Sequence, residues 1–241
     1  MQAEKASAPC RAFASCCGVG CPPFGSTFWQ ARRAAWNFAE PGLIPELGPE
    51  RAAELAEAFL EDTVAMVCAL DWVECIIAAA TRFERPYFKP QEVWQQSEGD
   101  LGERLEKILR LALKRREIVL AIGDDTPNLP ASLLESARQA LATADAVLGP
   151  SLDGGFYLIG LNDCPVGLLA EIQWSHSTTL AATMAKLDQF GMKTVLINSW
   201  YSVDGPEDLE RLRRQLAGDL STAPKTAALL RRFAAGPNDL R

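Results

Sequence analysis

The sequence predicts an α/β fold, because helical and strand patterns alternate along most of the chain. Beyond residue 42, apolar residues at helical spacing are followed repeatedly by short runs of consecutive apolar residues, which are typical of buried strands. The chain has 241 residues, of which 48% are hydrophobic, and this is enough for one sizeable core. We therefore expect a single α/β domain over residues 42–241, preceded by an atypical segment over residues 1–41.

The first half of the domain predicts two helices, each followed by a strand. One helix begins at Pro49, with Glu50 and Glu54 near its start, where the helix dipole favours negative charge. Residues 73–80 follow as a buried strand, and the apolar run 118–122 predicts a central strand after the second helix. The apolar stripe of that second helix consists of Leu105, Ile108, Leu109, Ala112 and Leu113.

The second half continues the alternation and ends in helices. A helix is expected at Asp204, which we place as its N-cap with Glu207 as the capping-box partner. The remaining predicted elements are a helix carrying Leu133, Leu134, Ala137 and Leu141, strands at 146–148 and 156–159, a helix over 179–190 that ends at Gly191, a strand at 194–197 and a short helix over 223–233.

Composition and charge exclude several classes of protein. With 31 acidic and 24 basic residues, the net charge of −7 disfavours nucleic-acid binding. The longest apolar run is far shorter than the ~20 residues of a membrane-spanning helix, so no span is expected. The cysteines of the first segment lack the paired knuckles of structural zinc sites, and the later ones lie singly in apolar or mixed surroundings. These patterns predict a cytoplasmic protein without structural zinc.

Acidic residues that follow strands are the first candidates for chemistry, because ligands of open α/β sheets bind beyond the carboxyl ends of the strands. Asp124 and Asp125 come directly after the strand at 118–122 and are suited to a hard divalent cation. Alternatively, they cap the helix that starts near Pro130. Asp204 also follows a strand, where a metal role competes with its role as N-cap.

Two glycine-containing segments are further candidates. Asp153 lies in a turn with Gly154 and Gly155, where it could bind sugar hydroxyls or act as a base, although a plain hairpin turn explains the same residues. Residues 96–105 combine a glycine loop with a helix start, which suits a nucleotide base or phosphate. A loop and cap without a ligand is the alternative for that segment.

Several strings of this sequence occur in the same order in the bacterial DUF2064 family, which the chain resembles over about residues 43–233. The most specific of them is the run from Asp153 to Gly160. The strings are Pro45-Glu46-Leu47-Gly48, the segment 96–105, Gly123-x-Asp125-x-Pro127, Gly149-Pro150-x-x-Asp153-Gly154-Gly155-Phe156-Tyr157-Leu158-Ile159-Gly160, Ile172-x-Trp174-Ser175 and Val203-Asp204-x-Pro206-Glu207-Asp208-Leu209.

The resemblance implies a glycosyltransferase of the GT-A, nucleotide-diphospho-sugar transferase type. Its fold would be a Rossmann-like three-layer sandwich with a mixed, mainly parallel sheet, and its partners a nucleotide sugar or nucleotide and a small-molecule acceptor. By position, Asp125 and Asp204 would hold Mg²⁺ or Mn²⁺, and Asp153 would be the catalytic residue. The residues placed at the nucleotide or substrate are Gln96, Gly99, Asp100, Arg104, Gly154, Gly155 and Tyr157. Nucleotidyl transfer in the same fold and non-catalytic nucleotide binding are the alternatives.

The sequence departs from the family in the loop that usually follows the first strand. That loop reads P-G-x-x-K-T-R-L in the family, whereas residues 38–45 here contain no basic residue and include Glu40. Asp124 stands where the family has Ser or Thr. We therefore hypothesise that a shifted reading frame or displaced start has replaced the family's first strand. The fold would still form, but with an exposed sheet edge and impaired nucleotide binding.

Overall fold

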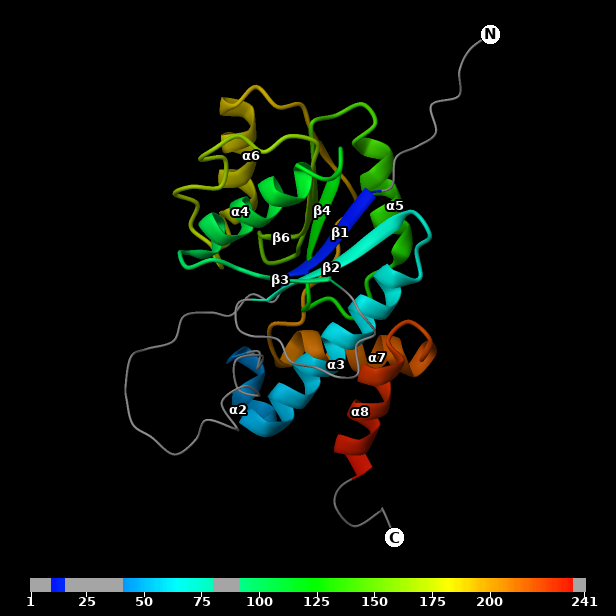
Figure 1. Cartoon of the computed structure of the whole chain (residues 1–241). Helices are drawn as coiled ribbons and strands as arrows, with labels where there is room; N and C mark the ends of the chain where they lie inside the picture. Colours follow the sequence, from blue (N-terminus) through cyan, green and yellow to red (C-terminus); the bar gives the residue numbers. More distant parts are fainter. Residues whose placement is uncertain (1–9, 16–40, 80–91, 236–241) are drawn as a thin grey trace.

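The centre of the protein is a seven-stranded sheet with the order β3-β2-β1-β4-β6-β5-β7 (Figure 1). The structure is a computed structural model that describes residues 10–15, 41–79 and 92–235. All neighbouring strands are parallel except β6, which runs antiparallel to both β4 and β5. The sheet is therefore mixed and mainly parallel, as predicted. Its strands are β1 (Cys10–Ser15), β2 (Val73–Ala79), β3 (Glu92–Gln95), β4 (Val119–Gly123), β5 (Ala146–Pro150), β6 (Phe156–Leu161) and β7 (Thr194–Leu196).

Helices cover both faces of the sheet and its carboxyl edge. They are α2 (Ile44–Leu47), α3 (Pro49–Cys68), α4 (Leu101–Leu113), α5 (Ala131–Ala140), α6 (Thr179–Gln189), α7 (Pro206–Gly218) and α8 (Pro224–Ala235), with a 3-10 helix η1 (Pro41–Leu43) before α2. Among the helices within the described ranges, none combines the length and apolar character needed to cross a membrane.

Alternating side chains of the strands build two separate cores. In β4, Leu120 and Ile122 pack with α3 and α5, whereas Val119 and Ala121 pack with α4 and α6 on the other face. This alternation follows from the two-residue repeat of a strand, and burial on both faces explains why β4 reads as a continuous apolar run. The result is the expected three-layer sandwich.

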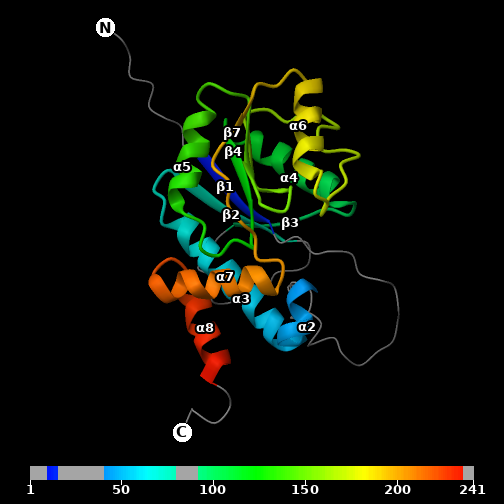
Figure 2. The ribbon, with the colours of Figure 1, turned by 180° about the vertical axis from the view of Figure 1, so that it is seen from behind.

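A third core lies below the sheet, where α7 and α8 pack beside the first half of α3 (Figure 2). Phe59 of α3 and Leu209 and Leu212 of α7 are its centre. The buried carboxylate of Asp62 ties α8 to α3, because its oxygens accept the backbone N–H groups of Lys225 (3.0 Å) and Thr226 (2.8 Å) at the start of α8. This assembly closes one side of the edge at which the parallel strands end.

A first strand is present in the sheet, although the hypothesis of an altered N-terminal segment predicted that it would be missing. β1 lies inside the sheet and pairs with β2 on one side and with β4 on the other. The expected exposed edge therefore does not arise at this position. The strand was missed because its residues show no two-residue apolar alternation over a useful length. The four-cysteine cluster lies outside the described residues, apart from the backbone of Cys10.

Most other predicted elements are confirmed to within a few residues. The helices expected from Pro49, around Leu105, around Leu133 and over 179–190 correspond to α3, α4, α5 and α6. β3 was not predicted, because it has only four residues, of which Trp94 alone is buried. The turn at 151–155 joins β5 and β6 as an antiparallel hairpin, so the predicted strands on either side of it are confirmed.

Candidate functional site

The carboxyl ends of the parallel strands meet in one row. The register pairs Gln95 with Ala79, Ser15 with Ala78, and Ser15 with Gly123. The end of β3 therefore lies three strand spacings, or roughly 14 Å, from the end of β4 along the same edge. The loops that follow these strands carry most of the predicted site residues.

Four aspartates gather near the carboxyl ends of β4, β5 and β7. Asp125 is partly buried, and burial followed by the charges of Asp124, Asp204 and Asp153 raises its pKa to about 8. The pKa of Asp204 is also raised. The largest cause is the partial burial of its carboxylate, and the charge of the nearby Asp153 adds to it. The three predicted positions 125, 153 and 204 are thus close enough to repel one another, which is typical of a functional cluster of acids.

The prediction that Asp204 is the N-cap of α7 is wrong. α7 begins after Gly205, and its capping box joins Gly205 to Asp208, whose Oδ2 accepts the Gly205 N–H at 3.2 Å. Glu207 is not the partner in this box, because the helix starts one residue later than predicted. The carboxylate of Asp204 instead accepts a hydrogen bond from the Ser202 hydroxyl. It is therefore available to a ligand.

The alternative in which the paired aspartates cap α5 is also wrong. Pro130 occupies the N-cap position of α5, and no side chain caps that end. Asp125 instead folds back over Gly123, where an added Cβ would lie 2.4 Å from Asp125 Oδ1. The backbone carbonyl of Asp125 accepts the Val203 N–H at 2.9 Å, which joins the end of β4 to the segment that carries Asp204.

The turn between β5 and β6 presents Asp153 at the surface of this cluster. Asp153 Oδ1 accepts the Gly155 N–H at 3.0 Å and the hydroxyl of Ser151, so the turn fixes one of its oxygens. A plain hairpin turn therefore accounts for part of this motif. Gly154 is required by the packing, since its φ is +91° and an added Cβ would lie 2.2 Å from the carbonyl oxygen of Ser177.

Replacing Gly154 with alanine is expected to lower the free energy of unfolding by about 2 kcal/mol or more, because the positive φ and the backbone contact both resist a Cβ. Gly191→Ala is the matched control: its φ is +69°, but nothing lies within 4 Å of an added Cβ. That control should lose only about 1 kcal/mol. Urea denaturation measures both, and equal losses would show that the contact with Ser177 contributes nothing.

The segment after β3 holds the predicted nucleotide residues at the far end of the row. Gln96 is buried, its Nε2 donates to the Ala78 carbonyl (3.0 Å), and its Oε1 accepts from Arg104 Nη1 (3.1 Å). Asp100 is the N-cap of α4 and accepts the Glu103 N–H at 2.9 Å, so the structural alternative holds for this residue. Gly99 has a φ of +124°, which fits the turn into α4.

Tyr157 has a packing role in the structure. Its side chain is buried, its ring covers Gly149, and its hydroxyl donates to the Asn198 carbonyl at 2.8 Å. Burial raises the pKa of this phenol. The aromatic residue of the most specific string therefore stabilises the β5–β6 hairpin against the segment after β7.

The sequence did not identify Gly42 and Ser202 as neighbours of the acids. An added Cβ at Gly42 would lie 1.9 Å from the carbonyl oxygen of Asp204, so η1 packs directly against the segment that carries this aspartate. Pro41 and Gly42 are the residues that match the start of the family's basic loop. This match to the family's loop was the sequence signal that could have identified Gly42. In the structure, the start of that loop lies beside the segment that carries Asp204.

The donor set suits a hard divalent cation, because carboxylates that follow different strands converge around Asp125. Within the described ranges, however, no group of three or more His, Cys, Asp or Glu side chains is arranged to hold an ion by itself. Mg²⁺ commonly takes one or two protein carboxylates and completes its shell with water and phosphate oxygens, so the residues fit a metal that arrives with a phosphorylated ligand.

Comparisons with solved structures identify the fold. The chain is 24% identical to a putative nucleotide-diphospho-sugar transferase from Desulfovibrio desulfuricans, with a TM-score of 0.74 and coverage of 94% of both chains. It is 12% identical to the 4-diphosphocytidyl-2C-methyl-D-erythritol synthase from Anaerococcus prevotii, with a TM-score of 0.53 and coverage of 87% of this chain and 96% of that one. The fold is therefore that of nucleotidyltransferases and nucleotide-diphospho-sugar transferases.

The sequence comparisons give one family match. A search of curated proteins gives no match. Residues 60–176 match DUF2064, which is described as an uncharacterized protein conserved in bacteria. This range contains the end of β4, the β5–β6 turn and the segment after β3, and so most of the candidate site. Over these residues the chain is similar to the DUF2064 family.

Proposed function

We propose that the protein transfers a sugar from a nucleotide-diphosphate sugar to a small-molecule acceptor, with the help of a divalent metal. The observation that carries the proposal is the convergence of Asp125, Asp153 and Asp204 from three strand ends, where burial and then the neighbouring carboxylates raise the pKa of Asp125 to about 8. Such a cluster costs stability unless a ligand offsets it. The fold's similarity to nucleotide-diphospho-sugar transferases supports the donor class.

Asp125 and Asp204 would hold Mg²⁺ or Mn²⁺, which would supply positive charge to the diphosphate that leaves. In this proposal Asp153, whose Oδ1 is fixed by Gly155 and Ser151, removes the proton from the acceptor hydroxyl. The new bond joins the acceptor oxygen to the anomeric carbon, and the bond from that carbon to the diphosphate breaks. The nucleoside diphosphate leaves with the bonding electrons.

The nucleoside would lie toward α4, at the other end of the row of strand ends. Arg104 is held there by Gln96 Oε1 and by the Asp100 carbonyl, so its guanidinium is positioned before a ligand arrives. The distance of roughly 14 Å between the ends of β3 and β4 is suited to an extended nucleotide sugar.

Nucleotidyl transfer from a nucleoside triphosphate to a phosphorylated small molecule is the second candidate. The similarity of the fold to a cytidylyltransferase-type synthase and to a nucleotidyl transferase from Methanothermobacter, with TM-scores of 0.53 and 0.51, favours it. The same acids would serve that reaction. The two reactions differ in product, because sugar transfer releases a nucleoside diphosphate and nucleotidyl transfer releases pyrophosphate.

The test is a calorimetric titration with nucleoside di- and triphosphates and nucleotide sugars, with and without Mn²⁺, followed by chromatography of products. We expect Mn²⁺-dependent binding to the wild type, which Asp125→Asn reduces at least tenfold. Asp188→Asn on the exposed face of α6 makes the same change of charge and should bind normally. Release of pyrophosphate alone would favour the second candidate. Binding without turnover would mean a non-catalytic nucleotide-binding protein.

A further inference from the structure

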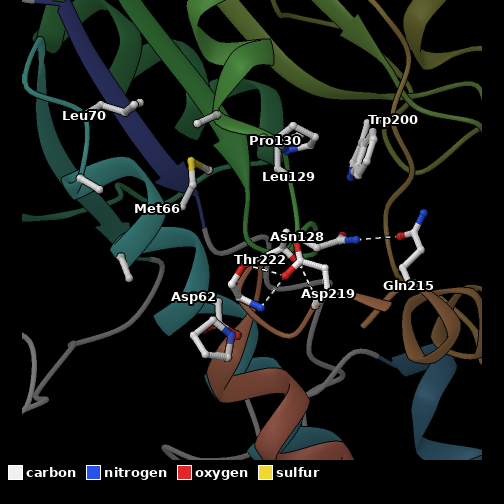
Figure 3. Close-up of a pocket in the computed structure, with 15 residues that line it drawn as sticks. Asp62, Met66, Leu70, Asn128, Leu129, Pro130, Trp200, Gln215, Asp219 and Thr222 are labelled. Atoms are coloured by element: carbon white, nitrogen blue, oxygen red, sulfur yellow. Dashed lines mark hydrogen bonds between the residues drawn. The ribbon is translucent and has the colours of Figure 1, made fainter. Parts of the chain in front are cut away.

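A separate pocket of about 610 Å³ lies between α3, the segment before α5, Trp200 and the helices α7 and α8 (Figure 3). None of the candidate aspartates 125, 153 and 204 lines it. Its volume falls in the range of sites for small organic ligands. The lining residues are Asp62, Ala65, Met66, Ala69, Leu70, Asn128, Leu129, Pro130, Ala131, Trp200, Gln215, Asp219, Ser221, Thr222 and Pro224.

Two polar atoms of the lining are buried without a hydrogen-bond partner in the described structure, Asn128 Oδ1 and Trp200 Nε1. Asn128 is only 6% exposed. Its Nδ2 donates to Gln215 Oε1 at 2.7 Å and to the Tyr201 hydroxyl at 3.0 Å, which fixes the orientation of the amide and leaves Oδ1 open. A buried polar atom without a hydrogen bond lowers the stability of the folded protein by about 1–3 kcal/mol. A ligand that donates to Asn128 Oδ1 and accepts from Trp200 Nε1 would remove this cost.

The rest of the lining determines the charge that a ligand can carry. Figure 3 shows Met66 and Leu70 on one side of the pocket and Trp200 on the other, with Asn128 between them. The charged side chains of the lining are the carboxylates of Asp62 and Asp219, and no lysine or arginine is among the lining residues. An anionic ligand is therefore disfavoured, and the pocket differs in this respect from a phosphate site.

We infer that this pocket binds a small uncharged molecule that has an apolar body and a carboxamide or lactam group. The N–H of that group would donate to Asn128 Oδ1, and its carbonyl would accept from Trp200 Nε1. The apolar body would lie against Met66, Leu70 and the indole ring. The proposal is independent of nucleotide binding, because it uses none of the residues assigned to the transferase site.

The probes are benzamide, benzoate and toluene, which share a ring and differ in the group that they present. Titrations followed by ¹H–¹⁵N NMR of the indole N–H groups report on Trp200, whose signal is assigned as the one missing from Trp200→Phe. We expect benzamide to shift this signal and to bind at least fivefold more tightly than either other probe. Equal binding of benzoate, or no shift of the Trp200 signal with benzamide, would overturn the proposal.

Two variants test the position of the ligand. Trp200→Phe keeps the aromatic ring and removes the unpaired donor, so benzamide affinity, followed by the benzamide signals, should fall about fivefold while the thermal midpoint is retained. Ala69→Phe should fill the pocket and abolish binding, whereas Ala228→Phe, at an exposed position of α8 outside the lining, should not. Retained binding in Ala69→Phe would show that benzamide binds elsewhere.

Discussion

Replacing Asp125 with asparagine is expected to stabilise the folded protein by about 5 kcal/mol at pH 8, at about 1.4 kcal/mol for each unit of pKa shift. Burial and three neighbouring aspartates raise the pKa of Asp125 to about 8 in the folded state, whereas it is about 3.9 in an unfolded chain. A raised folded-state pKa contributes stability that is present below about pH 4 and is lost as the pH rises to about 8. Asparagine keeps the shape of the side chain and removes this loss.

Urea unfolding between pH 5 and pH 8 measures this difference. The wild type should lose stability steadily from pH 5 to about pH 8 relative to Asp125→Asn, and Asp188→Asn should follow the wild type. If Asp125→Asn and Asp188→Asn have the same pH dependence, the Asp125 carboxyl titrates as an ordinary surface group and the acidic cluster carries no repulsion. Mn²⁺ with a nucleotide should stabilise the wild type and leave Asp125→Asn nearly unchanged.

The parts of the fold that were predicted from sequence are those whose burial dictates a regular apolar pattern. β4 is buried on both faces, so its five residues are apolar except for the terminal glycine. α4 has one face on the sheet, which explains its stripe of leucine and isoleucine. β3 has only four residues, and β1 includes Arg11 and Ser15, so neither strand shows such a pattern. Hydrogen bonding to neighbouring strands holds them in the sheet even though their own sequences do not predict a strand.

The candidate site was predictable in part. Ligands of α/β sheets bind beyond the carboxyl ends of the strands, which identifies candidate positions but does not decide whether an aspartate there binds a ligand or caps a helix. Asp125 and Asp204 were both candidates for a cap, and the structure gives the caps to Pro130 and Gly205 instead. Asp100 was a candidate for a ligand, and the structure makes it a cap. For Asp204 a shift of one residue in the helix start decides between the roles, and local sequence does not fix that start so closely.

The second pocket could not be predicted from sequence. Its lining comes from α3, the segment after Asp125, the segment after β7, and α7 and α8, and no one of these has an unusual pattern. Asn128 and Trp200 are 72 positions apart in the numbering. Their unpaired atoms become informative only after packing has removed both from water.

Removing residues 1–15 is expected to prevent cooperative folding, which is the largest effect that we predict. β1 lies between β2 and β4, with Ala12 paired to Cys75 on one side and to Leu120 on the other. Without β1, the backbone groups of β2 and β4 that face it lose their hydrogen-bond partners. The sheet that separates the two cores of the sandwich is then interrupted at its centre. The truncated chain should lack a cooperative thermal transition in circular dichroism and should elute as an aggregate in gel filtration.

Removal of residues 1–7 is the matched control, because it leaves β1 intact and should preserve the transition. Ala12→Pro tests the same point in the full-length chain, since proline cannot donate to a ladder and is confined to edges and ends of sheets. We expect that variant to lose about 3 kcal/mol or more. A chain that lacks residues 1–15 and still unfolds with the wild-type transition would show that β2 and β4 need no strand between them. The original hypothesis of a fold independent of its N-terminal segment would then stand.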